Sequence, residues 1–303
     1  MNAQLVDART DRHLWGQTYD RDLTDVFAIQ SEIAKTIANQ LQVKLSPREE
    51  DAIERPQTND ISAFDLYTRA KTLLLSTTFS PNSVQNVQQA IELLNQAVGR
   101  DPAFFEAYYQ LVYAHGFAYS VIGDHTPARV TLADAALQAA TRLRPDAGET
   151  HLARATYVYN WLRDYKGALA ELEVARRSLP NDPRIFELTG YILRRRSQEE
   201  EAVRNLERAV ELDPRNYFIL QQISLSYQVL RRYPEAAAAL DRALTIVPND
   251  FPTKTARALV DFFWKAETRP LHETIDSILA TNPGAISNVA DHPADTWLRA
   301  TAH

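Results

Sequence analysis

The chain has 303 residues, no cysteine and a net charge of −6. The absence of cysteine excludes disulfides, thiolate nucleophiles and zinc–thiolate sites, and the acidic balance argues against nonspecific nucleic-acid binding by this segment. No stretch reaches about 18 consecutive apolar residues, so the sequence predicts no membrane span.

The first elements are two strand-like segments, residues 3–8 and 13–19, joined by a turn at 9–12. An isolated hairpin is only marginally stable in water. We therefore expect these strands to belong to a larger sheet, and the chain to be a fragment of a longer protein.

A helix is predicted next over residues 26–41, where Val26, Ile29, Ile33 and Leu41 recur at helical spacing. A capping box at 46–49 then predicts a short helix reaching about Ile53. The stretch 55–60 has the composition of a linker. We place a domain boundary there, which divides the chain into residues 1–54 and 55–303.

From residue 60 onward the sequence repeats. Six prolines follow one another at intervals of 43, 35, 34, 34 and 35 residues, namely Pro102, Pro145, Pro180, Pro214, Pro248 and Pro283. An alanine lies five residues before each of the first five: Ala97, Ala140, Ala175, Ala209 and Ala243. A leucine lies eight residues before them, and another alanine twelve before. A fixed period with small and large apolar residues in phase indicates stacked helix pairs.

These units resemble the tetratricopeptide repeat (TPR) family. The closest match is 217–250, with Leu220, Ile223, Ser224, Tyr227, Tyr233, Ala236, Leu240, Ala243 and Pro248. Repeats are expected near 60–101, 102–146, 149–182, 183–216, 217–250 and 251–283, with a partial one at 284–303. The first two have long inner turns, and in 251–283 Leu271, Ile275 and Ile278 replace the alanine–leucine–alanine pattern. The resemblance implies an all-α superhelix (an α-solenoid) of about six helix pairs.

The N-terminal phrase carries a second resemblance. Its residues are Asn2–Ala8, His13–Trp15, Tyr19–Arg21, Val26–Gln30 and Glu32–Ala34. They are similar to the end of the TolB-amino-terminal-like α/β domain of bacterial multidomain TPR signalling proteins. That implies a short β-hairpin plus helix left from an α/β domain. Proteins of that kind often carry a cyclase, a kinase or a DNA-binding domain further upstream, so the resemblance indicates this context and no particular effector activity.

Residues with catalytic potential are scattered. The eight glycines are isolated, and none of the seven histidines lies at metal-ligand spacing with another. His115 falls on a predicted first helix, where a structural role is expected. We therefore predict no enzyme activity, no cofactor and no metal site within this chain.

Binding is expected on the concave surface, which in this family is lined by the first helix of each pair. The candidates are Tyr109, Tyr113, Phe117, Tyr157, Asn160, Trp161, Glu187, Tyr191, Arg194, Arg195, Phe218, Gln221 and Gln228. Tyrosine, tryptophan and arginine dominate binding hot spots because they bury a large area and still form hydrogen bonds. The competing interpretation places the same side chains in the core between helices. The runs 194–196 and 231–232 either complement helix C-termini or form a basic strip for an acidic partner.

We expect a protein–protein interaction or regulatory module of a bacterial signalling protein. Its ligand would be a peptide or partner domain. The alternative is a self-association scaffold that forms a homodimer, since the last unit leaves Trp264, Ile278, Leu279, Trp297 and Leu298 short of cover. A third possibility is part of an enzyme whose catalytic domain lies upstream. The expected compartment is the cytoplasm, or the periplasm if an anchor precedes the fragment.

Overall fold

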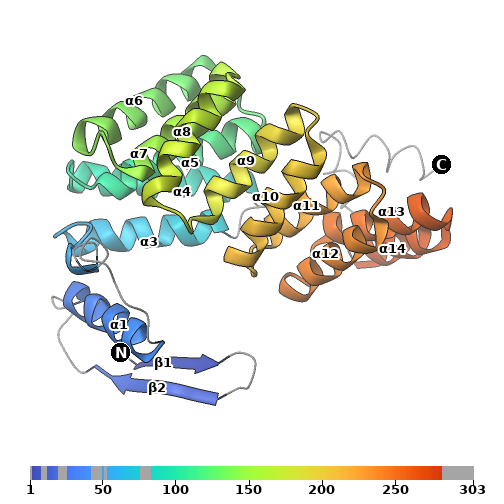
Figure 1. Ribbon diagram of the computed structural model, residues 1–303, viewed down its shortest axis with the longest axis horizontal. Coiled ribbons are helices and arrows are strands. Elements are labelled where there is room, and N and C mark those ends of the chain that lie inside the picture. The colour runs from blue at the N-terminus through green and yellow to red at the C-terminus, as the bar shows by residue number, and fades with distance from the viewer. Residues whose placement is uncertain are drawn as a thin grey trace.

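The computed structural model describes residues 2–7, 12–19, 26–41, 50, 53–75 and 83–281. At the N-terminus, β1 (Asn2–Asp7) and β2 (Arg12–Thr18) form an antiparallel pair, followed by α1 (Val26–Gln40). Phe27 of α1 meets Phe64 of α3 edge to face, with ring centroids 5.1 Å apart. Helix α1 therefore contacts the first helix of the repeat array, and the hairpin lies beside α1 (Figure 1). The predicted capping box at 46–49 lies outside the described residues.

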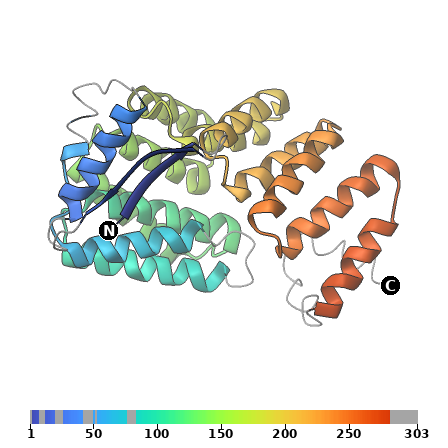
Figure 2. The ribbon, with the colours of Figure 1, turned by 90° about the horizontal axis from the view of Figure 1, so that it is seen from below.

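The rest of the described chain is a stack of six helix pairs (Figures 1 and 2). The pairs are α3 (Ile61–Leu75) with α4 (Ser83–Arg100), α5 (Phe105–Phe117) with α6 (Pro127–Leu143), α7 (Gly148–Tyr157) with α8 (Tyr165–Ser178), α9 (Pro183–Arg195) with α10 (Glu199–Leu212), α11 (Tyr217–Val229) with α12 (Tyr233–Ile246), and α13 (Phe251–Lys265) with α14 (Arg269–Thr281). Short π-helical turns, η2 (Ala118–Ile122) and η3 (Val158–Leu162), extend α5 and α7. The predicted all-α superhelix is confirmed, and the N-terminal hairpin is its one β element in the described residues. The predicted partial repeat at 284–303 lies outside them.

The repeating residues explain why the pairs stack. The alanines and leucines that recur in phase on the second helices are all buried, and so are their substitutes Leu271, Ile275 and Ile278 in the last pair. Small side chains let helix backbones approach, while leucines fill the space between them. The prolines from Pro102 to Pro248 lie in the turns between pairs, where their missing N–H costs little. No helix in the described ranges is long and apolar enough to cross a membrane.

Gly190 of α9 lies at a close approach to α10, the second helix of its pair. A Cβ added there would lie 2.7 Å from Leu206 Cγ and 3.2 Å from the Ala202 carbonyl oxygen. Gly190→Ala should therefore lower the free energy of unfolding by about 1–3 kcal/mol. Gly99 is a matched control, since it lies in α4 with no atom within 4 Å of the added Cβ. Gly99→Ala should raise stability by about 1 kcal/mol. Urea unfolding of both variants tests this pair, and equal shifts would contradict it.

Candidate partner-binding surface

The first helices of non-adjacent pairs touch each other across the inner surface of the array. The Arg184 guanidinium of α9 lies over the Tyr109 ring of α5, 4.7 Å from its centroid. Phe218 of α11 lies against Phe117 of α5, with ring centroids 6.3 Å apart. These contacts skip one pair and two pairs respectively. These contacts close part of the inner surface between α5 and α11.

Ionisable side chains lie at this closure. Arg184 forms an ion pair with Asp182, the N-cap of α9, at 2.9 Å. Glu187 is 6% exposed, and its Oε1 accepts a hydrogen bond of 2.8 Å from the Tyr191 hydroxyl. Burial is the main cause that raises the pKa of Glu187 to about 7. A carboxyl group at the closure thus titrates near neutral pH.

The candidate residues fall into three groups by exposure. The buried ones are Tyr109, Phe117, Asn160, Glu187 and Gln221. The half-buried ones are Tyr113, Tyr157, Trp161, Tyr191, Arg194, Phe218 and Gln228. Arg195 is exposed. The buried side chains have little exposed surface for a partner to contact. Direct contact with a partner therefore stays a prediction, mainly for the half-buried and exposed residues.

The two leading arginines have different surroundings. Arg194 donates to the Gln222 backbone oxygen at 3.2 Å and to its Oε1 at 3.0 Å. It therefore holds α9 to α11. Arg195 is exposed and hydrogen-bonded to Tyr159 of η3. Arg195 is thus the more accessible of the two cations.

The two arginines of the second basic run, Arg231 and Arg232, also differ in their contacts. Arg232 bonds to Glu235 at 2.9 Å and lies 3.7 Å from Glu207. Arg231 is exposed, and no ion pair of Arg231 is found among the described residues. The basic strip remains a prediction, with Arg195, Arg196 and Arg231 as its exposed members.

An aromatic cluster joins the two π-helical turns. Trp161 lies 5.0 Å from Tyr157 and 5.5 Å from Tyr119, and Tyr119 lies 4.4 Å from His125, all between ring centroids. Sequence reasoning missed Tyr119 and His125, because the insertion in the α5–α6 turn breaks the repeat alignment. The cluster ties the second pair to the third beside the inner surface.

His115 has the structural role that its position predicted. It is buried, and its Nδ1 accepts a hydrogen bond of 2.9 Å from Arg129 Nη1. An arginine only donates, so the histidine proton resides on Nε2. Burial is the main cause that lowers the pKa of His115 to about 4, and nearby Arg129 adds to it. The ring is therefore neutral at pH 7.

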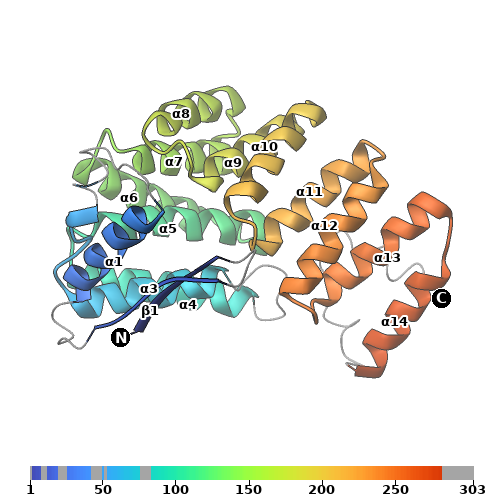
Figure 3. The same cartoon turned by 60° about the horizontal axis from the view of Figure 1, so that its bottom comes forward.

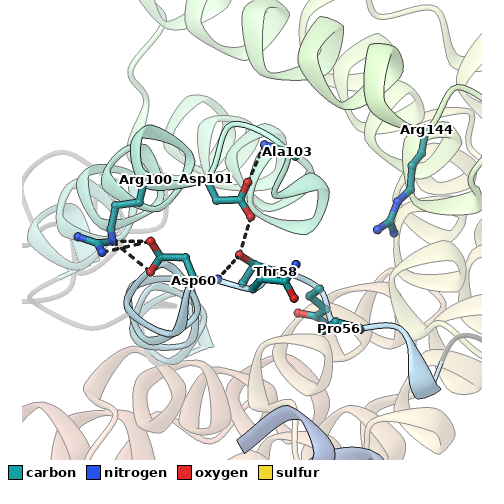
Figure 4. Close-up of a pocket in the computed structure, with 9 residues that line it drawn as sticks. Pro56, Thr58, Asp60, Arg100, Asp101, Ala103 and Arg144 are labelled. Atoms are coloured by element: carbon teal, nitrogen blue, oxygen red, sulfur yellow. Dashed lines mark hydrogen bonds and ion pairs between the residues drawn. The ribbon is translucent and has the colours of Figure 1, made fainter. Parts of the chain in front are cut away.

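A cavity of about 660 Å³ lies where the linker meets the first two pairs (Figure 4). Its polar groups satisfy one another: Thr58 donates to Asp101 at 2.5 Å, and Arg100 pairs with Asp60 at 3.1 Å. Arg144 lies on the opposite side and pairs with Glu106 at 2.8 Å. These bonds fasten residues 56–60 to the α4–α5 turn, so we assign the cavity a structural role.

Sequence reasoning also missed exposed apolar residues on α11 and α13, the first helices of the last two pairs. These are Leu225, Val229 and Phe263, in addition to Trp264, whose exposure was expected. The 34-residue period relates Val229 to Phe263 and was a usable signal. Ile278, expected to lack cover, is buried instead. Trp297 and Leu298 lie outside the described residues.

Comparison with known protein sequences gives a match to part of the chain. No family model matches the chain. A putative adenylate cyclase 3 of Rhizobium meliloti (strain 1021) is 36% identical over 111 residues, which cover 37% of this chain and 18% of that protein. The chain therefore spans less than a fifth of the length of this curated relative.

Solved structures show the same fold at low identity. A thermophilic TPR protein of Thermus thermophilus matches with a TM-score of 0.51 and 17% identity, over 65% of this chain and 98% of that one. Cut9–Hcn1, an APC/C hetero-tetramer, matches with a TM-score of 0.55 and 17% identity, over 88% and 53%. The pilus biogenesis factor PilW matches with a TM-score of 0.50 and 14% identity, over 73% and 94%. The fold is a TPR-type α-solenoid.

Proposed function

We propose that this chain is a noncatalytic protein-interaction module of a bacterial signalling protein. The observation that carries the proposal is the TPR-type superhelix, whose first helices and π-helical turns bear aromatic and arginine side chains that are at least partly exposed. Such surfaces bind extended or helical peptides, because the rings supply buried area and the charges choose the partner. Trp161, Tyr191 and Arg195 are the leading contacts, because they are at least partly exposed.

The signalling context is supported by the partial match to a putative adenylate cyclase. Within such a protein, residues 1–54 would be the end of an α/β domain of the TolB-amino-terminal-like type, and residues 55–303 the regulatory array. The contact between Phe27 and Phe64 supports a fixed junction between these parts. A partner bound to the array would then act on a domain outside this chain.

Selection from a display library of random peptides of about 15 residues tests the proposal on the full 303-residue chain. We expect selected peptides to bind with one-to-one stoichiometry and micromolar or better affinity, typical of peptide recognition. A photocrosslinker on the peptide should label the first helices. Failure to enrich any peptide above chain-free beads, or labelling confined to second helices, would contradict the proposal.

A second candidate is self-association through the last pair, since Phe263 and Trp264 are exposed on α13. Light scattering over a concentration series distinguishes the two. A constant monomer mass excludes the scaffold, whereas a dimer that Phe263→Asp dissolves supports it.

A further inference from the structure

One face of α5 makes the contacts that close part of the inner surface. Tyr109, Tyr113 and Phe117 follow one another at four-residue spacing on this helix, so they share a face. The Arg184 guanidinium of α9 lies over the Tyr109 ring, and the Phe117 ring contacts Phe218 of α11. This face of α5 therefore meets α9 at one end and α11 at the other. We call the contact between Phe117 and Phe218 the closing contact.

Glu187 of α9 lies near Tyr113, the middle residue of that face. Burial is the main cause that raises the pKa of Tyr113, and the nearby Glu187 carboxylate adds to it. The Tyr191 hydroxyl donates to Glu187 Oε1 at 2.8 Å. The Tyr191 ring in turn meets Phe218 edge to face, with ring centroids 6.4 Å apart. A single side chain thus joins the buried carboxyl group to the closing contact.

The buried core is divided at the same place. Buried apolar side chains of α3 to α9 form one cluster, and those from Val203 of α10 to Val260 of α13 form a second. Tyr191 packs against both clusters. In two views the pair α9–α10 lies between the pairs of α3 to α8 and the pairs of α11 to α14 (Figures 1 and 3). Helix α11 can therefore move away from α5 while each cluster keeps its own packing.

The groups that act on Glu187 leave its ionised form poorly compensated. Arg184 and the Tyr191 hydroxyl favour the carboxylate, but burial outweighs them, and Asp182 and Asp213, the C-cap of α10, add to the effect of burial. The Arg184 guanidinium is also shared, because it pairs with Asp182 at 2.9 Å. Ionisation of Glu187 in the closed form therefore leaves a buried charge without a cation of its own.

Charged groups on the neighbouring helices are bound elsewhere. Arg194 of α9 donates to Gln222 Oε1 of α11 at 3.0 Å. On α7, Arg154 pairs with Glu171 of α8 at 3.3 Å, and His151 bonds the same carboxylate at 2.6 Å. Helix α11 contains no Asp, Glu, Lys, Arg or His. The environment of Glu187 therefore depends on whether the closing contact is made.

We propose that the closing contact holds the inner surface closed while Glu187 is protonated and breaks when Glu187 loses its proton to water. The inference rests on the proposed function and names a way in which access to its site is regulated. In the closed form the carboxylate stays buried, whereas separation of α11 from α5 lets water reach it. Proton loss therefore favours the open form.

Linkage gives the size and the sign of the effect. The closed form raises the pKa of Glu187 from 4.5 to about 7, and the open form returns it to the ordinary value. A carboxyl group with a raised pKa favours the closed form at low pH and opposes it at high pH. The ratio of open to closed molecules should therefore rise by up to about thirtyfold between pH 5.5 and 8.5. His115 stays neutral over this range, because its pKa is lowered to about 4.

Spin labels test the inference on the full chain. The sequence has no cysteine, so Ala135→Cys in α6 and Ala238→Cys in α12 place one label on each of the two pairs that the closing contact joins. Both alanines are exposed. Pulsed electron spin resonance should show the ratio of longer to shorter label distances rising about tenfold or more from pH 5.5 to 8.5. Phe218→Ala removes the closing contact and should give the longer distance at both pH values.

Glu187→Gln and a matched variant provide the controls. Glutamine stays neutral, so Glu187→Gln should keep the shorter distance at both pH values. Glu207 accepts a hydrogen bond of 2.9 Å from the Tyr227 hydroxyl, as Glu187 does from Tyr191, but its side chain is 40% exposed. Glu207→Gln should therefore respond to pH as the wild type does. Circular dichroism confirms that each variant is folded.

A peptide from the random selection, chosen without histidine, measures the consequence for binding. It should bind the wild type about tenfold more tightly at pH 8.5 than at pH 5.5, because more molecules are open. The same peptide should show no such difference with Glu187→Gln.

The outcomes separate the two proposals. Label distances that do not change with pH, or that change equally in Glu187→Gln, overturn the inference and leave the proposed function standing. Affinity with the same pH dependence in the wild type and in Glu187→Gln overturns the regulation of this site. Failure to obtain any binding peptide overturns the proposed function, while the label distances still decide whether Glu187 controls the closing contact.

Discussion

Replacing Leu206 by alanine should lower the free energy of unfolding by about 3–4 kcal/mol. Leu206 lies in α10 and has no exposed surface. Its side chain packs against Gly190 of α9 so closely that a Cβ there would be 2.7 Å from it. Removing the leucine side chain beyond Cβ therefore leaves a cavity against α9. Urea unfolding followed by circular dichroism measures the loss.

The control is Leu132→Ala in α6, at an exposed position. It should change stability by no more than about 0.5 kcal/mol. Because an array of stacked pairs depends on each interface, Leu206→Ala should also speed hydrogen exchange in α9 and α11. A stability loss no greater than that of Leu132→Ala would contradict the packing described here.

Glu187→Gln should stabilise the protein at pH 7.5 by up to about 3 kcal/mol, with almost no effect at pH 4.5. The folded state raises the pKa of this carboxyl group from 4.5 to about 7, with burial as the main cause. Below the lower value the group is protonated in both states. As pH rises toward 7 the unfolded state ionises first, so the wild type loses stability. Glutamine stays neutral and still accepts from Tyr191.

The measurement is the difference in unfolding free energy between the variant and the wild type from pH 4.5 to 7.5. The difference removes contributions from other groups, including His115. That histidine has the opposite slope: its lowered pKa makes stability fall as pH drops from 6.5 toward 4. A difference that stays constant with pH, or a variant less stable at pH 7.5, would contradict the buried state of Glu187.

Periodicity made the repeat array predictable. The alanines and leucines in phase with the prolines allowed the helix pairs to be predicted, because residues at this spacing pack between neighbouring helices. The backbone at the inner turns was not predictable. Arg163, Ser197, Arg231 and Ala266 adopt positive φ there, a conformation usually taken by glycine. No glycine marked these turns, since tertiary packing overrides the local preference.

The candidate surface was predictable only in part. Positions within one repeat identified Arg195 and Tyr191, but not the contact of Phe218 with Phe117 across two pairs. That contact depends on how tightly the superhelix winds, which no single repeat encodes. For the same reason the contact of Arg184 with the Tyr109 ring was not predicted. The exposure of Val229 and Phe263 was not predicted, although the 34-residue period relates the two positions.

The most direct test of partner binding is hydrogen–deuterium exchange of the full chain with and without a peptide from the random selection. We expect slower exchange in the first helices α7, α9, α11 and α13, with α6, α8 and α10 unchanged. Protection confined to second helices or to the hairpin β1–β2 would contradict recognition by the inner surface of this array.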